Sequence, residues 1–135
     1  MVAPDPRPTS RAIVVLAAVV HRDGRFLVTR RLADGHLPGL WEFPGGKCEP
    51  GESHEVCLAR EFREELDVDI EVGPELLTTE HVYPEKTVRL HFRRCGLRSE
   101  PQPMLGQEMR WITRDELQTL SFPEADRDLI RMLTS

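Results

Sequence analysis

No stretch of the sequence is apolar for long enough to cross a membrane. The longest candidate, residues 12–20, falls well short of the ~20 residues that a spanning helix needs. It also lacks a cationic leader with a cleavage site close behind it, so a signal peptide is not expected. We therefore expect a cytoplasmic protein that has no membrane partner.

Cysteine is scarce, with three residues in a chain of 135: Cys48, Cys57 and Cys95. An odd number without C-x-x-C spacing argues against both a zinc site and a disulfide framework. We expect three free thiols in a reducing compartment, with Cys57 acting as a small packing residue.

An excess of positive charge is also missing, because the formal net charge is −5. A general binder of nucleic-acid polymers would normally carry a basic surface, so that partner is not expected. A small nucleotide is still a suitable ligand, provided that metal ions and a few arginines offset the repulsion between its phosphates and an acidic protein.

The alternation of apolar runs with turn residues predicts an α/β protein. Residues 1–10 are expected to be a flexible N-terminal arm, and residues 11–135 to form one domain. Apolar runs and alternating patterns predict strands at 12–20, 25–30, 40–43, 68–73, 76–83, 87–95 and 108–112. Helical spacing of apolar residues predicts helices at 54–66 and 124–133.

Two of these elements carry specific expectations about burial. The strand at 87–95 alternates apolar with polar residues, so one face should be buried and the other exposed to water. The helix at 54–66 should begin after an N-cap at Ser53 and bury the apolar side chains that recur at helical spacing, namely Val56, Ala59, Phe62 and Leu66. Together they predict a sheet with a helix packed on it.

Three glutamates share one side of the predicted central helix. Glu61, Glu64 and Glu65 are spaced i, i+3 and i+4, which places them within about 100° of arc. Like charges held this close repel one another, and a hard divalent cation such as Mg²⁺ would relieve the repulsion. Arg60, four residues before Glu64, could orient that carboxylate. Taken alone, the same run could also be a solvated helix face.

The loop before the helix favours the metal-binding interpretation. Gly45, Gly46 and Gly51 allow backbone conformations that are closed to other residues. From Gly46 the chain follows the pattern G-x5-E-x7-R-E-F-x-E-E, which resembles the Nudix box, and the resemblance covers 46–68. Asp67 stands where the family usually has glycine. Aspartate is among the few residues that tolerate the left-handed conformation expected at that helix end.

The resemblance implies the Nudix α/β/α sandwich with a mixed β-sheet, and it assigns roles to individual residues. The cofactor would be Mg²⁺, with Mn²⁺ as an alternative, and the substrate would be a small nucleotide. Catalytic roles would fall to Glu52, Arg60, Glu64 and Glu108. The implied metal ligands are the backbone carbonyl of Gly45 or Gly46 and the carboxylates of Glu61, Glu64, Glu65 and Glu108.

Segments outside the box resemble the MutT branch of the Nudix superfamily, namely 30–36, 40–47, 108–111 and 121–126. Enzymes of that branch release pyrophosphate from nucleoside triphosphates by water attack at the β-phosphorus. Their best-known substrate is 8-oxo-dGTP, which they remove before it can be incorporated into DNA. Glu108 would be the fourth acidic residue of the branch, binding metal or serving as general base. A solvent-exposed glutamate is the alternative.

Four residues are implied in substrate binding. Arg31 would contact phosphate, and His36 lies in a loop near the expected site. Phe43 would form a wall of the base pocket, and Asp126 could read the base. For each of the first three, an ordinary surface or core role is the alternative.

Asp126 departs from the guanine-specific MutT enzymes, which carry asparagine at the matching position. Asparagine both donates and accepts, whereas an aspartate ionised at pH 7 only accepts. Cytosine offers an amine donor, and cytidine-triphosphate pyrophosphohydrolases of the branch carry aspartate there, but a guanine edge also presents donors. Oxidised guanine, cytosine or both are therefore open as the preferred base, and an N-cap of the last helix is the structural alternative.

Two further classes compete with this interpretation. A Nudix hydrolase acting on ADP-ribose or dinucleoside polyphosphates would carry signatures after the box that are missing here. A non-catalytic Nudix nucleotide-binding module would usually have lost box carboxylates, and this chain keeps all of them. We therefore expect a nucleoside triphosphate pyrophosphohydrolase, as a monomer or a homodimer.

Overall fold

The computed structural model describes residues 11–32 and 38–135. Its strands are β1 Arg11–Arg22, β2 Arg25–Arg30, β3 Trp41–Glu42, β4 Gly45–Lys47, β5 Ile70–Tyr83, β6 Lys86–Leu97 and β7 Met109–Thr113. Its helices are α1 His54–Leu66, α2 Arg114–Leu117, the 3-10 turn η1 Glu124–Asp126 and α3 Arg127–Thr134. The expected arm at 1–10 and the loop residue His36 lie outside the described residues.

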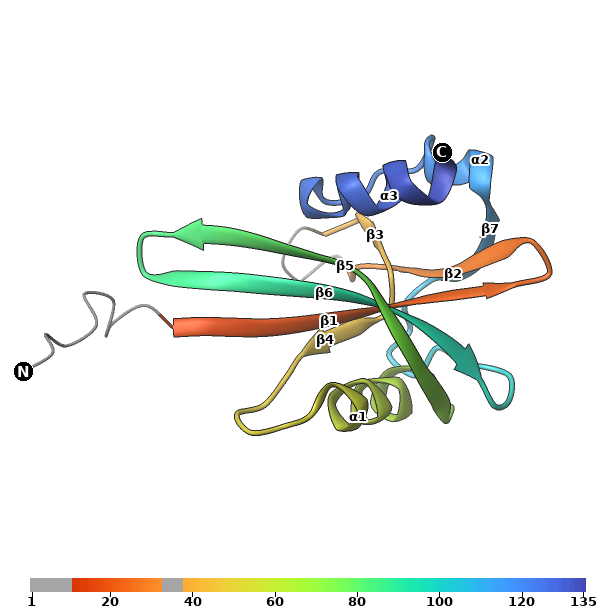
Figure 1. The fold of residues 1–135 in the computed structure, drawn as a ribbon. Coiled ribbons are helices and arrows are strands. Elements are labelled where there is room, and N and C mark those ends of the chain that lie inside the picture. The colour runs from red at the N-terminus through yellow and green to blue at the C-terminus, as the bar shows by residue number, and fades with distance from the viewer. Residues whose placement is uncertain (1–10, 33–37) are drawn as a thin grey trace, which may run out of the picture.

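The strands form a mixed sheet with helices on both faces, which confirms the α/β sandwich (Figure 1). The strand order is β3-β2-β1-β6-β5, with β4 pairing to β1 and β7 pairing to β2. β1 runs parallel to β6 and antiparallel to β2 and β4. Its side chains alternate between two cores: Leu16 and Ala18 lie on the α1 side, whereas Ala17 and Val19 lie on the α3 side. Burial on both faces explains why this strand is apolar throughout 12–20.

Helix α1 covers one face of the sheet and has the bounds that the sequence predicts. Ser53 is its N-cap, because its hydroxyl accepts a hydrogen bond from the Val56 amide at 3.1 Å. Asp67 ends the helix in the left-handed conformation, with φ of 49°. The predicted buried stripe is partly wrong: Val56 is 55% exposed and Ala59 is also exposed. The buried residues are Cys57, Leu58, Phe62 and Leu66.

The short helices α2 and α3 cover the opposite face (Figure 1). The last helix, expected as one unit, is divided into η1 and α3. Leu129 of α3 is fully buried, and Ile130 and Leu133 pack against the same core. Among the described residues, no helix is long and apolar enough to cross a membrane.

The sheet differs from the sequence prediction in three places. The segments predicted as separate strands at 68–73 and 76–83 form the single strand β5, which carries an irregularity near Glu75. The glycine-rich turn is partly strand, since β4 pairs with β1. The face of β6 that was expected to be wet lies partly under α1, where Cys95 is buried and the Arg93 side chain is 20% exposed.

The expectation of three free thiols is wrong, because Cys48 and Cys57 form a disulfide. The loop between β4 and α1 folds back and brings their Cα atoms to 5.3 Å. Cys95 is the free cysteine of the described residues, and it is buried. A separation of nine residues across a turn and a helix start has no recognisable spacing signal, so the pairing could not be predicted from the sequence.

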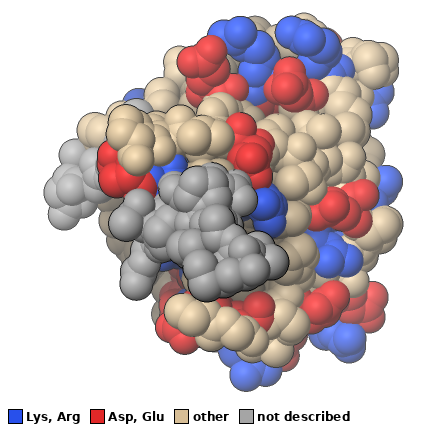
Figure 2. Space-filling view, turned by 60° about the vertical axis from the view of Figure 1, so that its left-hand side comes forward, with Lys and Arg blue, Asp and Glu red and all other residues tan. Residues whose placement is uncertain are grey.

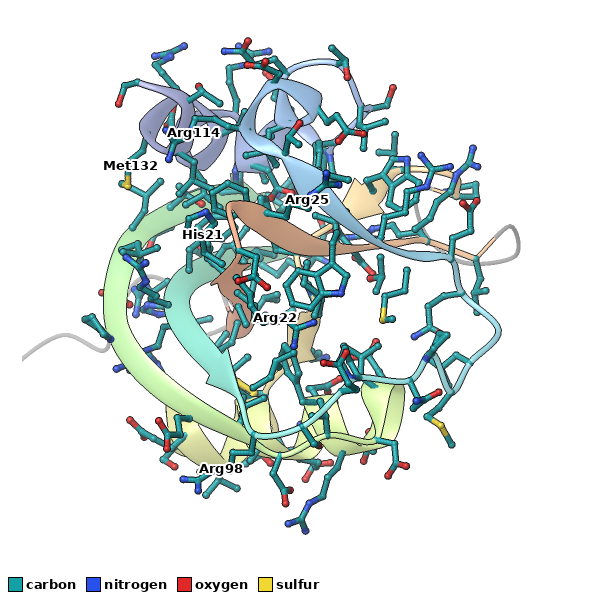
Figure 3. The ribbon with its side chains drawn as sticks, turned by 90° about the vertical axis from the view of Figure 1, so that its right-hand side faces the viewer. His21, Arg22, Arg25, Arg98, Arg114 and Met132 are labelled. Carbon is teal, nitrogen blue, oxygen red and sulfur yellow. A yellow bond between two sulfur atoms is a disulfide. The ribbon has the colours of Figure 1, made fainter. Side chains whose placement is uncertain are left out.

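Arg22, the last residue of β1, contacts both β7 and the loop that follows β6. Its guanidinium lies 4.2 Å from the centre of the Trp111 ring and pairs with Glu100 at 2.9 Å. Figure 3 shows Arg22 near the middle of the view, between β7 above and α1 below. The contact fixes the position of the segment that leads into β7.

Candidate active site

Two glycines allow the loop before α1 to lie against both the sheet and the helix. A Cβ on Gly45 would come within 1.9 Å of the Leu16 carbonyl oxygen. A Cβ on Gly46 would lie 2.5 Å from the Glu61 carboxylate. No other residue fits at either position without movement, so the backbone approaches the carboxylates of α1 here as closely as glycine permits.

Arg60 joins several of the predicted catalytic carboxylates. Its Nε and Nη1 donate hydrogen bonds at 2.8 Å to Glu52 and to Glu61, respectively, and Nη2 donates at 3.2 Å to the Lys47 carbonyl. Glu64 is 3.6 Å from Nη1. The hydrogen bond from Arg60 is the main reason why the pKa of Glu52 falls to about 2. The arginine therefore holds the loop and the helix together as one charged unit.

Glu65 is half-buried on the α1 stripe, as is Glu61, whereas Glu64 is exposed. Burial, followed by hydrogen bonding to Glu61 and its charge, raises the pKa of Glu65 to about 9. Its Oε2 atom is buried and has no hydrogen-bond partner among the described residues. An orphaned buried oxygen beside a second carboxylate is what a divalent cation would satisfy, and oxygen donors suit Mg²⁺. The predicted metal ligands on α1 thus fit such an ion.

Glu108 pairs with arginines of the sheet rather than with Arg60. It is about half exposed and forms ion pairs with Arg30 at 3.1 Å and Arg110 at 3.3 Å. Its neighbour Gln107 donates a hydrogen bond to the Glu65 carbonyl at 3.1 Å, which keeps this loop beside the end of α1. Both the metal role and the general-base role of Glu108 stay predictions.

A cavity of about 540 Å³ opens beside the glycine loop. Gly45 and Gly46 line it on one side, and Asp126 lines it on another. Apolar side chains of β1 and β6, including Val15 and Leu90, form much of the remaining wall. A site with apolar walls and a few polar groups is typical of a pocket that holds a small organic ligand.

Arg31, Glu42 and Asp126 form one group of interacting polar side chains in the lining of the cavity. Arg31 Nε and Glu42 Oε2 are 2.9 Å apart. Burial is the main reason why the pKa of Asp126 rises to about 7, the charge of Glu42 raises it further, and Arg31 opposes the shift. The premise of a fully ionised Asp126 at pH 7 is therefore wrong. Asp126 stands at the N-cap position of α3, as the structural alternative expects, but its side chain makes no capping hydrogen bond.

The other predicted substrate residues have mixed outcomes. Phe43 lines the cavity, but it is also a core residue that stacks on Phe122 at 5.4 Å between ring centroids. Arg31 lines the cavity beside Glu42, and its contact with phosphate stays a prediction. His36 lies outside the described residues.

Among the residues that line the cavity, sequence reasoning did not single out Glu42, Lys86 or the hairpin residue Glu85. Glu42 follows Trp41 in a short strand and has no distinguishing pattern in the sequence. Lys86 and Glu85 lie at the turn between β5 and β6, and only the tertiary fold brings that turn to the cavity. A charged residue inside a predicted apolar strand is the one signal that could have indicated Glu42.

The distribution of charged side chains on the surface is compatible with a small ligand. Figure 2 shows acidic and basic side chains interspersed across one face of the described part of the chain. A continuous basic tract, as a binder of nucleic-acid polymers would need, is not visible on that face among these residues.

Known proteins with similar sequences and structures belong to the family that the fold and the box indicate. The NUDIX domain family matches residues 15–132. The chain is 34% identical over 120 residues to the CTP pyrophosphohydrolase of Escherichia coli, covering 88% of this chain and 87% of that protein. It is 29% identical over 121 residues to the 8-oxo-dGTP diphosphatase of the same organism, covering 89% and 94%. The solution structure of the E. coli ORF135 protein superimposes with a TM-score of 0.81 at 32% identity, covering 96% and 91%. The chain therefore belongs to the NUDIX domain family and is a Nudix hydrolase.

Proposed function

We propose that this Nudix hydrolase converts nucleoside triphosphates and water to nucleoside monophosphates and pyrophosphate. One observation carries the proposal: a single cavity is lined both by the glycines of the box loop and by the buried Asp126. A nucleotide bound there would have its phosphates beside the carboxylate helix and its base beside a carboxyl group. Relatives named as CTP pyrophosphohydrolase and 8-oxo-dGTP diphosphatase support the same reaction class.

The residues of α1 have distinct tasks in this proposal. Glu61, Glu64 and Glu65, with the carbonyl of Gly45 or Gly46, would hold divalent metal. A bound Mg²⁺ ion neutralises phosphate charge and lowers the pKa of a bound water. Arg60 positions the carboxylates, because it binds Glu52 and Glu61 through separate nitrogens. The task of such an arginine is to keep the ligands in place before substrate arrives.

We assign Glu64 as the general base that accepts the proton of the attacking water. It is the most exposed carboxylate among the partners of Arg60, with 60% of its side chain accessible. Glu108 is the alternative base, and its ion pairs with Arg30 and Arg110 would have to loosen for that role. Water attack at the β-phosphorus then leaves the nucleoside monophosphate as the departing group.

The proposed substrate is 8-oxo-dGTP, whose hydrolysis would remove an oxidised nucleotide from the pool used for DNA replication. Asp126, whose pKa lies at about 7, is protonated in part of the molecules at neutral pH. A protonated carboxyl donates one hydrogen bond and accepts another, as the asparagine of guanine-specific relatives does. The ionised fraction would instead accept from the amine of cytosine. Cytosine nucleotides are therefore the second candidate, favoured by the 34% identity to a CTP pyrophosphohydrolase.

A nucleotide panel tests the proposal directly. Canonical and oxidised nucleoside triphosphates would be incubated with the protein and Mg²⁺, and pyrophosphate and phosphate would be measured separately. In ¹⁸O-labelled water, attack at the β-phosphorus places the label in pyrophosphate rather than in the monophosphate. Release of phosphate alone, or no turnover of any triphosphate alongside cleavage of a diphosphate-linked substrate, would refute the proposed reaction.

A further inference from the structure

Three metal-ligating side chains from three elements meet on the α1 face of the sheet, and none of them is a proposed metal ligand of the box or lines the cavity. They are His54, the first residue of α1, Glu75 of β5 and His91 of β6. One donor atom from each lies within 4.8 Å of the donors of the other two. None of these residues has a task in the proposed hydrolysis.

The irregularity in β5 is what turns Glu75 toward this cluster. Leu77 pairs with Phe92 and Glu75 pairs with Arg93, so Leu76 is an extra residue between successive pairs. In a regular strand Glu75 and Leu77 would share a face. The extra residue lets Leu76 and Leu77 both pack against the α3-side core while Glu75 contacts His91. Figure 3 shows β5 curving along the edge of the sheet down to α1.

The contacts within the cluster indicate what each imidazole can offer. His91 Nδ1 contacts a Glu75 carboxylate oxygen and lies 3.2 Å from the Thr78 hydroxyl, so His91 and Glu75 already face each other through Nδ1. His54 Nδ1 lies 3.1 Å from a guanidinium nitrogen of Arg93. The two imidazole rings are 4.5 Å apart between centroids. Glu75 is 41% exposed and His91 is 14% exposed, so an ion can enter from solvent.

We propose that His54, Glu75 and His91 form a binding site for a divalent transition-metal ion of the Zn²⁺ class. Two imidazoles and one carboxylate are ligands that such ions favour, whereas Mg²⁺ prefers a set of oxygen donors. Bonds of ~2.0–2.1 Å place tetrahedral donors roughly 3.3 Å apart, so small side-chain rotations complete the site. The fourth position is left to water. The chain thus separates two kinds of metal by donor chemistry, with Mg²⁺ on the box and Zn²⁺ on this cluster.

Arg93 competes with the ion for His54. Neutral imidazole has one lone pair, and the guanidinium engages the nitrogen that it contacts. Arg93 also donates to the Gly73 carbonyl at 2.9 Å and lies 3.8 Å from Glu55, and these two contacts hold it when it releases His54. Metal binding then joins the start of α1 to β5 and β6. The carboxylates of Glu55 and Glu75 offset the charges of the ion and of Arg93.

The test is titration of the protein with Zn²⁺ by calorimetry, with Mg²⁺ saturating the box and no reductant present, so that the Cys48–Cys57 disulfide stays closed. The intact chain should bind one zinc ion. His91→Ala and Glu75→Gln each remove a proposed ligand. Loss of only an outer hydrogen-bond partner of a ligand typically weakens a metal site 10- to 100-fold, so each variant should weaken zinc binding by about 100-fold or more. Removing the competing guanidinium by Arg93→Met should strengthen it.

His81→Ala is the matched control, because His81 is also on β5 but outside the cluster. It should bind zinc as the intact chain does. Circular dichroism and Mg²⁺-dependent turnover show whether each variant is folded. Absence of zinc binding by the intact chain overturns the site. So does wild-type affinity in folded His91→Ala and Glu75→Gln.

Discussion

Asp126 is a buried carboxyl beside Glu42, and its protonation determines which hydrogen bonds it offers to a base. Above pH 8 it is mainly ionised and accepts from the amine of cytosine. At that pH, Asp126→Asn should cost about 1.5–3 kcal/mol toward a cytosine nucleotide, a roughly ten- to hundredfold fall in kcat/KM. Activity on 8-oxo-dGTP should fall less or rise. The measurement is kcat/KM for both substrates in both proteins.

Asp128→Asn is the control for this substitution, since Asp128 is an exposed aspartate on the same helix. It should leave both substrates unaffected. A general loss of activity would indicate a damaged helix start rather than altered base reading. If the ratio between the two substrates changes by less than about twofold in Asp126→Asn, Asp126 does not read the base.

The same carboxyl predicts how stability depends on pH. Folded Asp126 keeps its proton up to about pH 7, compared with 3.8 for the ordinary group. Protonated Asp126 therefore contributes to the free energy of unfolding at low pH, and this contribution is lost as pH rises from about 4 to about 7. The free energy of unfolding should fall by up to ~4 kcal/mol more in the wild type than in Asp126→Asn over that range. Urea unfolding of both proteins at pH 4 and pH 8 measures the difference, and parallel pH profiles would contradict it.

At the scale of single residues, some members of the candidate site could be predicted from the sequence and others could not. The ligand set on α1 could be predicted, because its spacing is local and the helix brings it together. The role of Glu42 could not be predicted, since Glu42 of β3 approaches Asp126 of η1 only in the folded protein. The raised pKa of Asp126 depends on that neighbour and on burial, and neither is visible in the sequence.

Among the elements, α1 carries the chemistry in the proposed mechanism, and its acidic residues differ in position. Glu61→Gln or Glu64→Gln should lower kcat by about 100-fold or more, because a neutral amide is a poor ligand for Mg²⁺. Glu55→Gln on the first turn of α1 is the control and should keep near wild-type turnover. Steady-state kinetics at saturating Mg²⁺ measures the effect. Wild-type turnover in both box variants would refute the assignment of the metal to this helix.

The bounds of α1 were predictable because local signals at both ends agree with each other. Ser53 caps the start and Asp67 ends the helix in the left-handed conformation. Its buried side was predicted less well, since Val56 is exposed and Leu58 is buried. Helical spacing alone does not show which of several overlapping apolar stripes meets the sheet. The disulfide at Cys57 and the packing of Leu58 decide it.

For the molecule as a whole, the carboxylate cluster predicts that metal stabilises the fold. Without metal, burial beside Glu61 keeps Glu65 protonated at neutral pH, because its pKa lies at about 9. Metal that binds the native carboxylates favours folding by mass action. At about 100 times Kd the gain is ~2.7 kcal/mol, which corresponds to a rise in Tm of roughly 5–10 °C. Thermal unfolding in chelator and in millimolar Mg²⁺, without nucleotide and at matched ionic strength, measures it.

A double variant, Glu61→Gln with Glu64→Gln, is the control for this measurement. It lacks two of the proposed ligands and should lose most of the response to Mg²⁺. An unchanged Tm in the wild type on adding Mg²⁺ would contradict the prediction. An equal rise in both proteins would instead point to a metal bound elsewhere.

The parallel alignment of β1 with β6 has a consequence for the order in which the protein folds. Ile13 of β1 lies opposite Val88, roughly 75 residues later in the chain, so closing this pair costs more chain entropy than closing the hairpins β1–β2 and β5–β6. Both hairpins and α1 can form from local contacts before the middle of the sheet exists. The cavity has walls from β1 and from β6, so it closes only at that last step. On the ribosome, the pocket must therefore wait until β6, and after it Asp126, has emerged.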